Sequence, residues 1–409
     1  MAMIQCKECG KELSSGAKFC PHCGCPNKVS VCPECGKPVE SNAVVCPECG
    51  YPLQKKTANS IITENLDKLT GASSKSYITF KDLFKGTFKK HNAQELDEVF
   101  VCGGPKTTPA LQQIDPHHVG AWVYLKIFIF FLIAYIPTRI GFITYGNSNF
   151  LPAMIMLGGF AMPLTVLIFF FEINVFRNVP FYRVVEYFVL GGALSLITAI
   201  LFFSLDFNTD ISTYSGALMV GVIEEAAKAV IVAAFLFRDK KCQYILNGLL
   251  IGAAVGAGFA AFETAGYILN YGLKSGLAAM LQVIRIRGFL APGGHVAWAA
   301  IEGAALMYAK GFDTLSKKHL NDKRFLLVCI IPIVLHGVWD MPINLPYYGL
   351  PIILTVLAWL VIIYFINLGL KQVDDAKELE KAKAAAVPAA LPMQEAEGNQ
   401  PQPSSSPAK

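Results

Sequence analysis

Long apolar segments between residues 121 and 370 constrain this chain more than any other feature of its sequence. Each is about 20 residues long, which is enough for a helix to cross a hydrocarbon layer about 30 Å thick. Hydrophobic residues make up 54% and charged residues 16% of the 409 residues, against about 25% charged in a soluble domain. The sequence excludes a wholly soluble protein and predicts an all-α polytopic membrane protein with about eight transmembrane helices, at 121–143, 150–175, 188–206, 213–237, 244–269, 291–309, 324–344 and 349–370.

The charges in the connecting loops predict the orientation of these helices. The second, fourth and sixth connections carry Lys or Arg, whereas the first, third and seventh carry neither. Because basic loops stay in the cytosol, we expect a multi-pass protein of a cell inner or plasma membrane with both termini cytosolic. The fifth connection is the exception: Lys274, Arg285 and Arg287 would lie outside or in a re-entrant segment, and the pattern leaves 274–290 unplaced.

A repeat with a period of 26 residues occupies residues 1–53, and each copy reads CxxC, ten residues, CxxC. Thiolates two residues apart can face one ion, and two such pairs complete a tetrahedral zinc site. No secretory signal precedes the repeat, so a reducing compartment favours metal over disulfides. We predict tandem zinc ribbons that hold two structural zinc ions through Cys6, Cys9, Cys20, Cys23, Cys32, Cys35, Cys46 and Cys49.

The other segments are polar. Residues 54–120 have the mixed composition of a cytosolic linker, and residues 371–409 begin with a charged helical run and end in Pro, Gln and Ser, which is typical of a disordered tail. The net charge of +5 is spread along the chain, so we expect no nucleic acid as a partner. A cytosolic protein is the partner expected for the ribbons, because an ion closed by four thiolates has no open position for chemistry.

Ionisable side chains collect inside four of the predicted membrane helices. Each such charge costs at least about 2.5 kcal/mol on insertion scales, so these residues usually serve a pathway or a reaction. Counted from the predicted outer helix ends, the two histidines and the three glutamates at 224, 225 and 263 lie one to three turns deep and can share one layer near the outer side. The set comprises Glu224, Glu225, Lys228, Glu263, His295, Glu302, His336 and Asp340. Small residues at 248, 252, 256 and 260 predict close helix packing around this layer.

Three motifs, EEAAK, FAAFE and HGVWD, resemble in this order the PrsW family of glutamic-type intramembrane proteases. The hallmarks of that family, EExxK, FxxxE and HxxxD on successive helices, fall here on Glu224, Glu225, Lys228, Phe259, Glu263, His336 and Asp340, with His295 as a further candidate. The resemblance covers about residues 120–370 and implies a membrane-anchored substrate such as an anti-sigma-factor-like regulator. The zinc ribbons are not part of this family pattern.

We therefore expect an intramembrane endopeptidase that uses a glutamate-activated water. It would cut a single-pass membrane protein in or near the outer half of its transmembrane segment. Either glutamate of the EExxK motif would act as the base, with Glu263 as a second carboxylate. The two histidines would stabilise the oxyanion or protonate the leaving amine, Asp340 would orient His336, and Lys228 would neutralise a glutamate.

Three other hypotheses compete with this one. A proton- or cation-coupled transporter also uses carboxylates at mid-depth, although the sequence shows no repeat of the EExxK helix. A metal-dependent membrane hydrolase could use the same Glu and His residues, although HExxH is absent. A buried ion-pair network that only fixes helix packing is the third, although one lysine cannot balance several acids.

Overall fold

The computed structural model describes residues 3–6, 8–14, 19–25, 29–32, 34–40, 46–50, 58–74, 76–205, 207–288 and 291–386. The chain divides into two compact units, residues 1–68 and 69–409. In the first unit β1 (Met3–Gln5) pairs antiparallel with β2 (Glu12–Ser14), and β3 (Val29–Val31) pairs in the same way with β4 (Pro38–Glu40). The two hairpins follow the sequence repeat, so each copy folds alike. Helix α1 (Ala58–Thr70) comes next.

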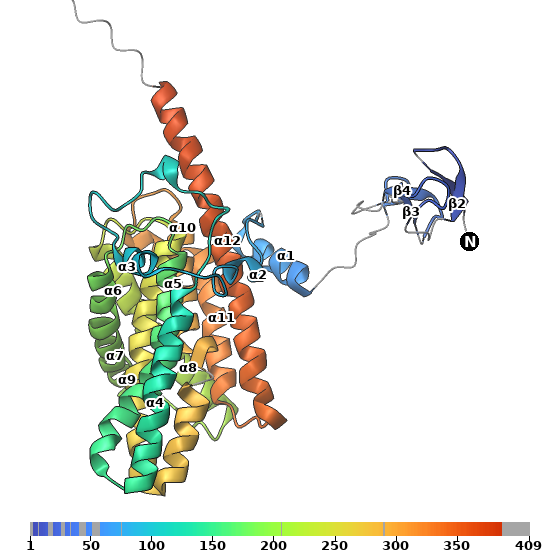
Figure 1. The fold of residues 1–409 in the computed structure, drawn as a ribbon. Helices are drawn as coiled ribbons and strands as arrows, with labels where there is room; N and C mark the ends of the chain where they lie inside the picture. Colours follow the sequence, from blue (N-terminus) through green and yellow to red (C-terminus); the bar gives the residue numbers. More distant parts are fainter. Residues whose placement is uncertain are drawn as a thin grey trace, which may run out of the picture. The chain divides into compact units, whose positions relative to one another are not determined.

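The described part of the second unit is helical, and its long helices run side by side (Figure 1). Three short helices come first: α2 (Phe80–Leu83), α3 (Ala93–Phe100) and a single turn at Leu111–Gln113. The long elements are α4 (Val123–Tyr145), α5 (Leu151–Ile173), α6 (Phe181–Glu186) joined by a π-turn to α7 (Gly192–Phe203), α8 (Tyr214–Arg238), α9 (Ile245–Val283), α10 (His295–Lys310), α11 (Lys323–Asp340) and α12 (Gly349–Ala386).

Helices occur at all eight predicted membrane positions, and the all-α polytopic class is confirmed. Within the described residues, five helical segments are long and apolar enough to cross a membrane: Val123–Tyr145, Ser148–Ile173, Phe181–Phe203, Ile245–Gly288 and Pro346–Ala385. The other three helices, α8, α10 and α11, carry most of the ionisable set. These three helices are too short or too charged to count as apolar membrane-spanning helices. They are therefore buried by packing against other helices of the protein.

Helix α9 lies at the centre of the unit and packs against α10 through its small residues. A Cβ atom at Gly248 would lie 2.2 Å from the carbonyl oxygen of Gly303, and one at Gly252 would lie 2.0 Å from that of Ala299. Such distances are impossible for any other residue, so the two backbones touch. The predicted close-packing role of these glycines is confirmed.

The chain reverses direction at Gly276, which corrects the predicted end of this helix at 269. Gly276 has φ 79° and ψ −175°, a conformation that is essentially restricted to glycine. Residues 277–288, here called the return arm, then run back along α9: Met280 meets Gly272, and Arg287 meets Glu263. The described part of the segment that the loop pattern left unplaced, residues 274–288, therefore forms a re-entrant hairpin with α9.

The segment expected to be a linker is packed on the helical unit from residue 69 onward. Asn367 of α12 accepts hydrogen bonds from the backbone of Tyr77 and Ile78, at 2.7 and 3.0 Å. The backbone nitrogen of Ala121 bonds to Leu83, which is fully buried. Helix α12 also continues without a break past the predicted boundary at 370, to Ala386. The expected disordered end, 387–409, lies outside the described residues.

Candidate active site and zinc ribbons

The seven residues predicted to be catalytic, six from the motifs and His295 as a further candidate, lie together in one cluster of the helical unit. Helix α8 supplies three of them, α9 and α10 one each, and α11 two: Glu224, Glu225, Lys228, Glu263, His295, His336 and Asp340. Helix α10 begins at His295 and α11 ends at Asp340, whereas α9 continues past the cluster to Gly276. Glu263 is thus about 20 Å from the end of its helix, deeper than the one to two turns that the sequence suggested.

A single carboxylate oxygen of Glu225 accepts hydrogen bonds from two side chains, a lysine and a histidine. Its Oε1 atom lies 2.6 Å from Lys228 Nζ and 2.5 Å from His336 Nδ1, and both donate to it. The other ring nitrogen of His336, Nε2, consequently faces Asp340 Oδ2 at 3.3 Å and Glu224 Oε2 at 3.7 Å. Glu225 therefore orients His336 and balances the charge of the buried lysine.

Lys228 also determines which nitrogen of His295 carries the hydrogen. Lys228 Nζ lies 2.8 Å from His295 Nδ1. An ammonium group can only donate, so Nδ1 accepts and the ring hydrogen is on Nε2. His295 Nε2 lies 2.9 Å from Glu263 Oε2, to which it donates. A chain of hydrogen bonds therefore joins Glu225, Lys228, His295 and Glu263 across three helices.

Glu224 is the least compensated carboxylate of the cluster. Its Oε2 atom is buried and has no hydrogen-bond partner among the described residues. Glu225 Oε2 shares this property, but the other oxygen of Glu225 is bonded twice. Glu224, His295 and His336 can each offer one ligand atom, and these atoms lie within 4.8 Å of one another. One carboxylate and two imidazoles are a ligand set typical of catalytic zinc.

Direct backbone contacts fix where the histidines lie. A Cβ atom at Gly256 would lie 2.3 Å from the carbonyl oxygen of His295, and one at Gly221 would lie 2.8 Å from the backbone nitrogen of Gly337. Helix α9 therefore touches α10 at His295, and α8 touches α11 beside His336. The indole of Trp298 stacks on the His336 ring, with centroids 4.6 Å apart.

The sequence did not predict Arg287 as a site residue, but the return arm brings it into the same cluster. Its guanidinium group pairs with the Glu263 carboxylate and lies 4.4 Å from the centre of the Tyr267 ring. A signal was present in the sequence: Arg287 is one of the basic residues that break the charge pattern of the loops.

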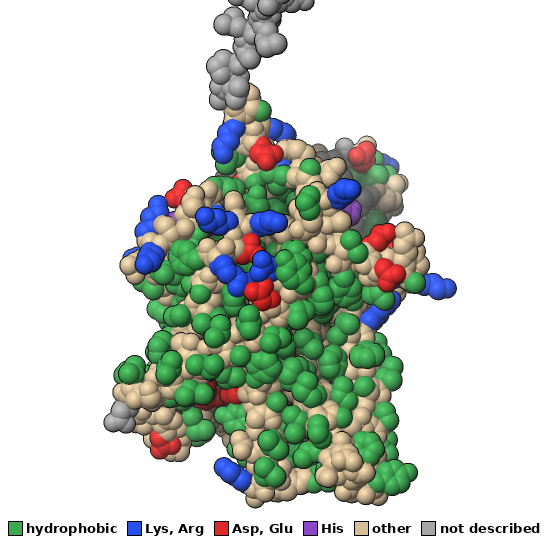
Figure 2. All heavy atoms as spheres, turned by 90° about the vertical axis from the view of Figure 1, so that its left-hand side faces the viewer, with side chains coloured by type: hydrophobic (Ala, Val, Ile, Leu, Met, Phe, Trp, Pro, Cys, Tyr) green, Lys and Arg blue, Asp and Glu red, His purple; other side chains and the backbone are tan. Residues whose placement is uncertain are grey.

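The cluster is open to solvent on one side. The side chains of Asp340 and Arg287 are 23% and 22% exposed, whereas those of Glu225 and Lys228 are fully buried. Figure 2 shows a small acidic area recessed within the apolar belt of the molecule. The cluster is therefore accessible from outside the protein on the side of Asp340.

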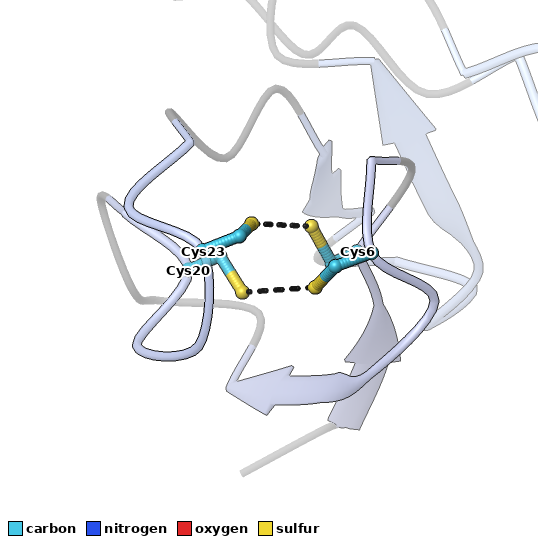
Figure 3. A group of neighbouring side chains, drawn as sticks. Cys6, Cys20 and Cys23 are labelled. Carbon is cyan, nitrogen blue, oxygen red and sulfur yellow. Dashed lines mark hydrogen bonds between the residues drawn. The ribbon is translucent and has the colours of Figure 1, made fainter.

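The eight cysteines of the N-terminal repeat form two separate clusters. Sulfur atoms from different CxxC pairs face each other at 3.6 Å (Cys6 and Cys23) and 3.7 Å (Cys9 and Cys20), as Figure 3 shows for the first cluster. The second cluster repeats these distances. Zinc bonds of about 2.3 Å place tetrahedral sulfurs about 3.8 Å apart, whereas a disulfide needs about 2.05 Å. The clusters therefore have the dimensions of zinc sites made of four cysteines.

Backbone hydrogen bonds lower the pKa of one of these thiols, that of Cys6. The N–H groups of Cys9 and Glu8 lower the pKa of the Cys6 thiol to about 7. Thiolate is the form that binds zinc, so a lower pKa leaves fewer protons for the ion to displace near neutral pH.

Comparison with known families is consistent with both sites. Residues 153–367, slightly more than half of the chain, match the family described as PrsW family intramembrane metalloprotease. The chain belongs to this family. The PrsW match includes every residue of the buried cluster. The resemblance seen in the three motifs is confirmed, and the chain is an integral membrane protein of a protease family.

Three curated PrsW proteins each match about half of the chain. Protease PrsW of Clostridioides difficile (strain 630) is 28% identical over 194 residues, covering 46% of this chain and 78% of that protein. The Shouchella clausii (strain KSM-K16) protein is 23% identical, and the alignment covers 52% of this chain and 93% of that protein. The Bacillus subtilis (strain 168) protein is 24% identical, and the alignment covers 48% of this chain and 88% of that protein. No solved structure matches the chain.

A second family, described as a double zinc ribbon, matches residues 6–50. Together with the sulfur geometry, this match confirms the two four-cysteine clusters as a double zinc ribbon that binds two zinc ions.

Proposed function

We propose that this PrsW protein hydrolyses a peptide bond of a single-pass membrane protein, with a divalent metal ion held by Glu224, His295 and His336. One observation carries the proposal: ligand atoms from these three residues, on α8, α10 and α11, converge within 4.8 Å. The description of the family as metalloproteases supports the same conclusion. Membership of a protease family also favours hydrolysis over the transporter considered from the sequence.

The residues present fit a metal ion on three grounds. The buried Oε2 atom of Glu224 has no hydrogen-bond partner among the described residues, and a cation would satisfy it. His336 donates through Nδ1 to Glu225, the usual outer partner of a metal-bound histidine. Three protein ligands leave a further position open, as in catalytic zinc sites. When bound, the ion would supply a Lewis acid and an activated water.

The other residues of the cluster serve as proton acceptors and supports. Glu263 lies 2.9 Å from His295 Nε2, beside the converging ligand atoms, and is the carboxylate that accepts the proton of the attacking water and passes it to the leaving amine. Glu225 and Lys228 orient the two histidines. Asp340, at the exposed edge, lies 3.3 Å from Nε2 of His336, the atom through which this histidine would bind the ion.

One feature of His295 makes metal binding depend on pH. Its Nε2 atom carries a hydrogen directed at Glu263, so His295 could bind an ion through Nε2 only after this proton passed to Glu263 and Lys228 gave a proton to Nδ1, which keeps the ring neutral. Protons therefore compete with the ion, and metal occupancy of this site should rise with pH.

A mechanism without metal, favoured by the sequence analysis, remains the second candidate because the same atoms support it. Glu225 is engaged by Lys228 and His336, so Glu224 would be the base that activates water. The Nε2 hydrogen of His295 would then serve as a proton donor. A metal measurement separates the two mechanisms.

The position of the site supports a substrate cut toward the outer half of the membrane. The cluster lies where α10 begins and α11 ends, and Lys and Arg side chains gather at the opposite end of the belt, around the C-terminal part of α12 (Figure 2). By the positive-inside rule, that basic end faces the cytosol. A membrane-anchored regulator of the anti-sigma-factor type fits such a site as substrate.

The test uses the full chain in detergent and a variant in which the eight ribbon cysteines are serine. Elemental analysis should find three metal ions per wild-type chain, two in the ribbons and one in the cluster, and one ion in the variant. Adding His336→Ala to the variant should remove the last ion. Mass spectrometry should map cleavage of single-pass membrane proteins incubated with the wild type.

Each outcome decides between the candidates. Cleavage by the variant without the eight ribbon cysteines, when it holds no metal and a chelator does not inhibit it, would establish the glutamate mechanism. Absence of cleavage by the wild type would refute both mechanisms.

A further inference from the structure

The return arm is fixed in place by apolar contacts that do not involve its charged residues. Ile284 fills a notch at Gly158 of α5, where a Cβ atom would lie 2.9 Å from the isoleucine side chain. Met280 and Ile284 belong to a buried apolar cluster with Met154 of α5 and Ile268 of α9. The arm is therefore anchored between two long helices, and this anchoring determines where its last residues lie.

Both arms of the hairpin have similar lengths, which brings Arg287 to the level of Glu263. Glu263 precedes the turn at Gly276 by about 13 residues, and Arg287 follows it by about 11. The guanidinium group then contacts three residues on one stretch of α9: it pairs with Glu263, lies 3.3 Å from Thr264 Oγ1 and stacks 4.4 Å from the centre of the Tyr267 ring.

These contacts hold one carboxylate oxygen from two directions. Arg287 and His295 Nε2 both bond to Oε2 of Glu263, one from the return arm and one from α10. A glutamate side chain has three rotatable bonds, so a single partner would leave its carboxylate free to swing. The planar guanidinium group, braced by Thr264 and Tyr267, removes that freedom.

We infer that Arg287 is a positioning residue of the reaction, which holds the Glu263 carboxylate at the cleavage site. The inference rests on the proposed function, in which Glu263 carries the proton between water and the leaving amine. Arg287 acts through Glu263 and needs no contact with the substrate. Because reacting groups displaced by about 1 Å can lose about 100-fold in rate, its removal should affect turnover more than substrate binding.

Arg285 provides a matched control on the same turn of the arm. It is exposed, and its guanidinium group lies 6.0 Å from the ring of Tyr348, away from the glutamates. Arg285→Ala removes the same charge and the same number of atoms two residues away. We expect this variant to keep wild-type turnover.

The experiment compares Arg287→Ala, Arg287→Lys and Arg285→Ala in the full-length protein, with a substrate that the wild type cleaves. For Arg287→Ala we expect kcat to fall by about 100-fold with KM little changed. Arg287→Lys keeps the positive charge but lacks the planar guanidinium group, so its kcat should lie between those of the wild type and Arg287→Ala. Guanidinium ion added to the solution should restore part of the kcat of Arg287→Ala, and should not activate Glu263→Gln.

Chemical rescue separates positioning from a structural role, because free guanidinium can replace the missing group but cannot repair a misfolded arm. Wild-type kcat in Arg287→Ala would overturn the inference. A loss of kcat that guanidinium does not restore, together with a lowered Tm, would also overturn it and assign Arg287 to the packing of the arm. If the wild type itself cleaves no substrate, the proposed function fails first.

Discussion

Two adjacent glutamates of α8 have different surroundings, and these differences separate their expected roles. Glu225 is fully buried and accepts close hydrogen bonds from Lys228 and His336, whereas Glu224 has only a 3.7 Å contact with His336 and its side chain is 11% exposed. Neighbouring positions on a helix point about 100° apart, so adjacent residues of one motif need not share an environment. The motif alone could not distinguish them.

Replacing each glutamate by glutamine should therefore give different defects. Glu224→Gln should abolish cleavage and leave Tm near the wild-type value, because the amide removes the ligand charge and loses only the 3.7 Å contact with His336. Glu225→Gln leaves Lys228 buried without its counter-charge, which should cost about 3–5 kcal/mol of folding stability in addition to activity. Thermal unfolding in detergent and a cleavage assay measure both effects. Equal Tm values for the two variants would contradict this assignment.

Among the contacts between helices, the one between α9 and α10 determines the position of His295. Gly252→Val should reduce both stability and turnover, because the new Cβ atom would lie 2.0 Å from the carbonyl oxygen of Ala299. The cost should exceed the about 1–3 kcal/mol of overpacking, since a backbone atom cannot rotate away. Gly266→Ala is the control on the same helix: no atom lies within 4 Å of its Cβ position. This control should be neutral or stabilising by about 0.5–1 kcal/mol.

The turn at Gly276 should be sensitive for a different reason. A Cβ atom there meets nothing within 4 Å, so packing does not forbid a larger residue. The backbone conformation disfavours any other residue, at a cost of about 1–3 kcal/mol. We expect Gly276→Ala to lower Tm and to reduce turnover by loosening the return arm, as measured by thermal unfolding and the cleavage assay. Wild-type Tm and turnover would show that the hairpin does not depend on this turn.

At the scale of the whole molecule, the division into two units predicts independent metal sites. Serine at the eight ribbon cysteines should remove two zinc ions and leave the helical unit folded, because residues 69–409 form their own compact unit. The thermal transition of the helical unit, measured in detergent, should keep its midpoint. A shared transition that shifts with ribbon zinc would show that the two units fold cooperatively.

The pH dependence of the ribbons follows from the same thiol chemistry. Because the pKa of Cys6 is lowered to about 7, its thiolate is available near neutral pH. Zinc should stay bound there and be released as the pH falls well below 7, when protons displace it from the thiolates. Zinc release from the full chain, followed with a chelating dye during acid titration, checks this. Retention of both ions at strongly acidic pH would contradict the role of the thiolates.

The place of the cut is also a property of the whole molecule. The site lies at the ends of α10 and α11 away from the basic end of the belt, so cleavage should fall in the outer half of a substrate helix or just outside it. A substrate helix must unwind to expose its carbonyl, which is easier where water enters. Mass spectrometry of the product should show this position. A cut at the cytosolic boundary would contradict the proposed orientation.

Several features of this protein could be predicted from local patterns in its sequence. Apolar length requires helices that cross the membrane, the spacing of eight cysteines requires two tetrahedral sites, and three motifs mark the reactive residues. Each of these signals lies within a short stretch of chain, because hydrophobic burial and metal ligation restrict residue types at fixed spacings.

The tertiary structure alone decided which distant residues meet. Arg287 reaches Glu263 only because Gly276 reverses the chain, and Tyr77 and Ile78 bond to Asn367, almost 300 residues later. The distinction between Glu224 and Glu225 depends on where α11 presents His336. Such contacts depend on how the helices pack in space. Packing is determined by many side chains at once, so no local spacing in the sequence predicts these contacts.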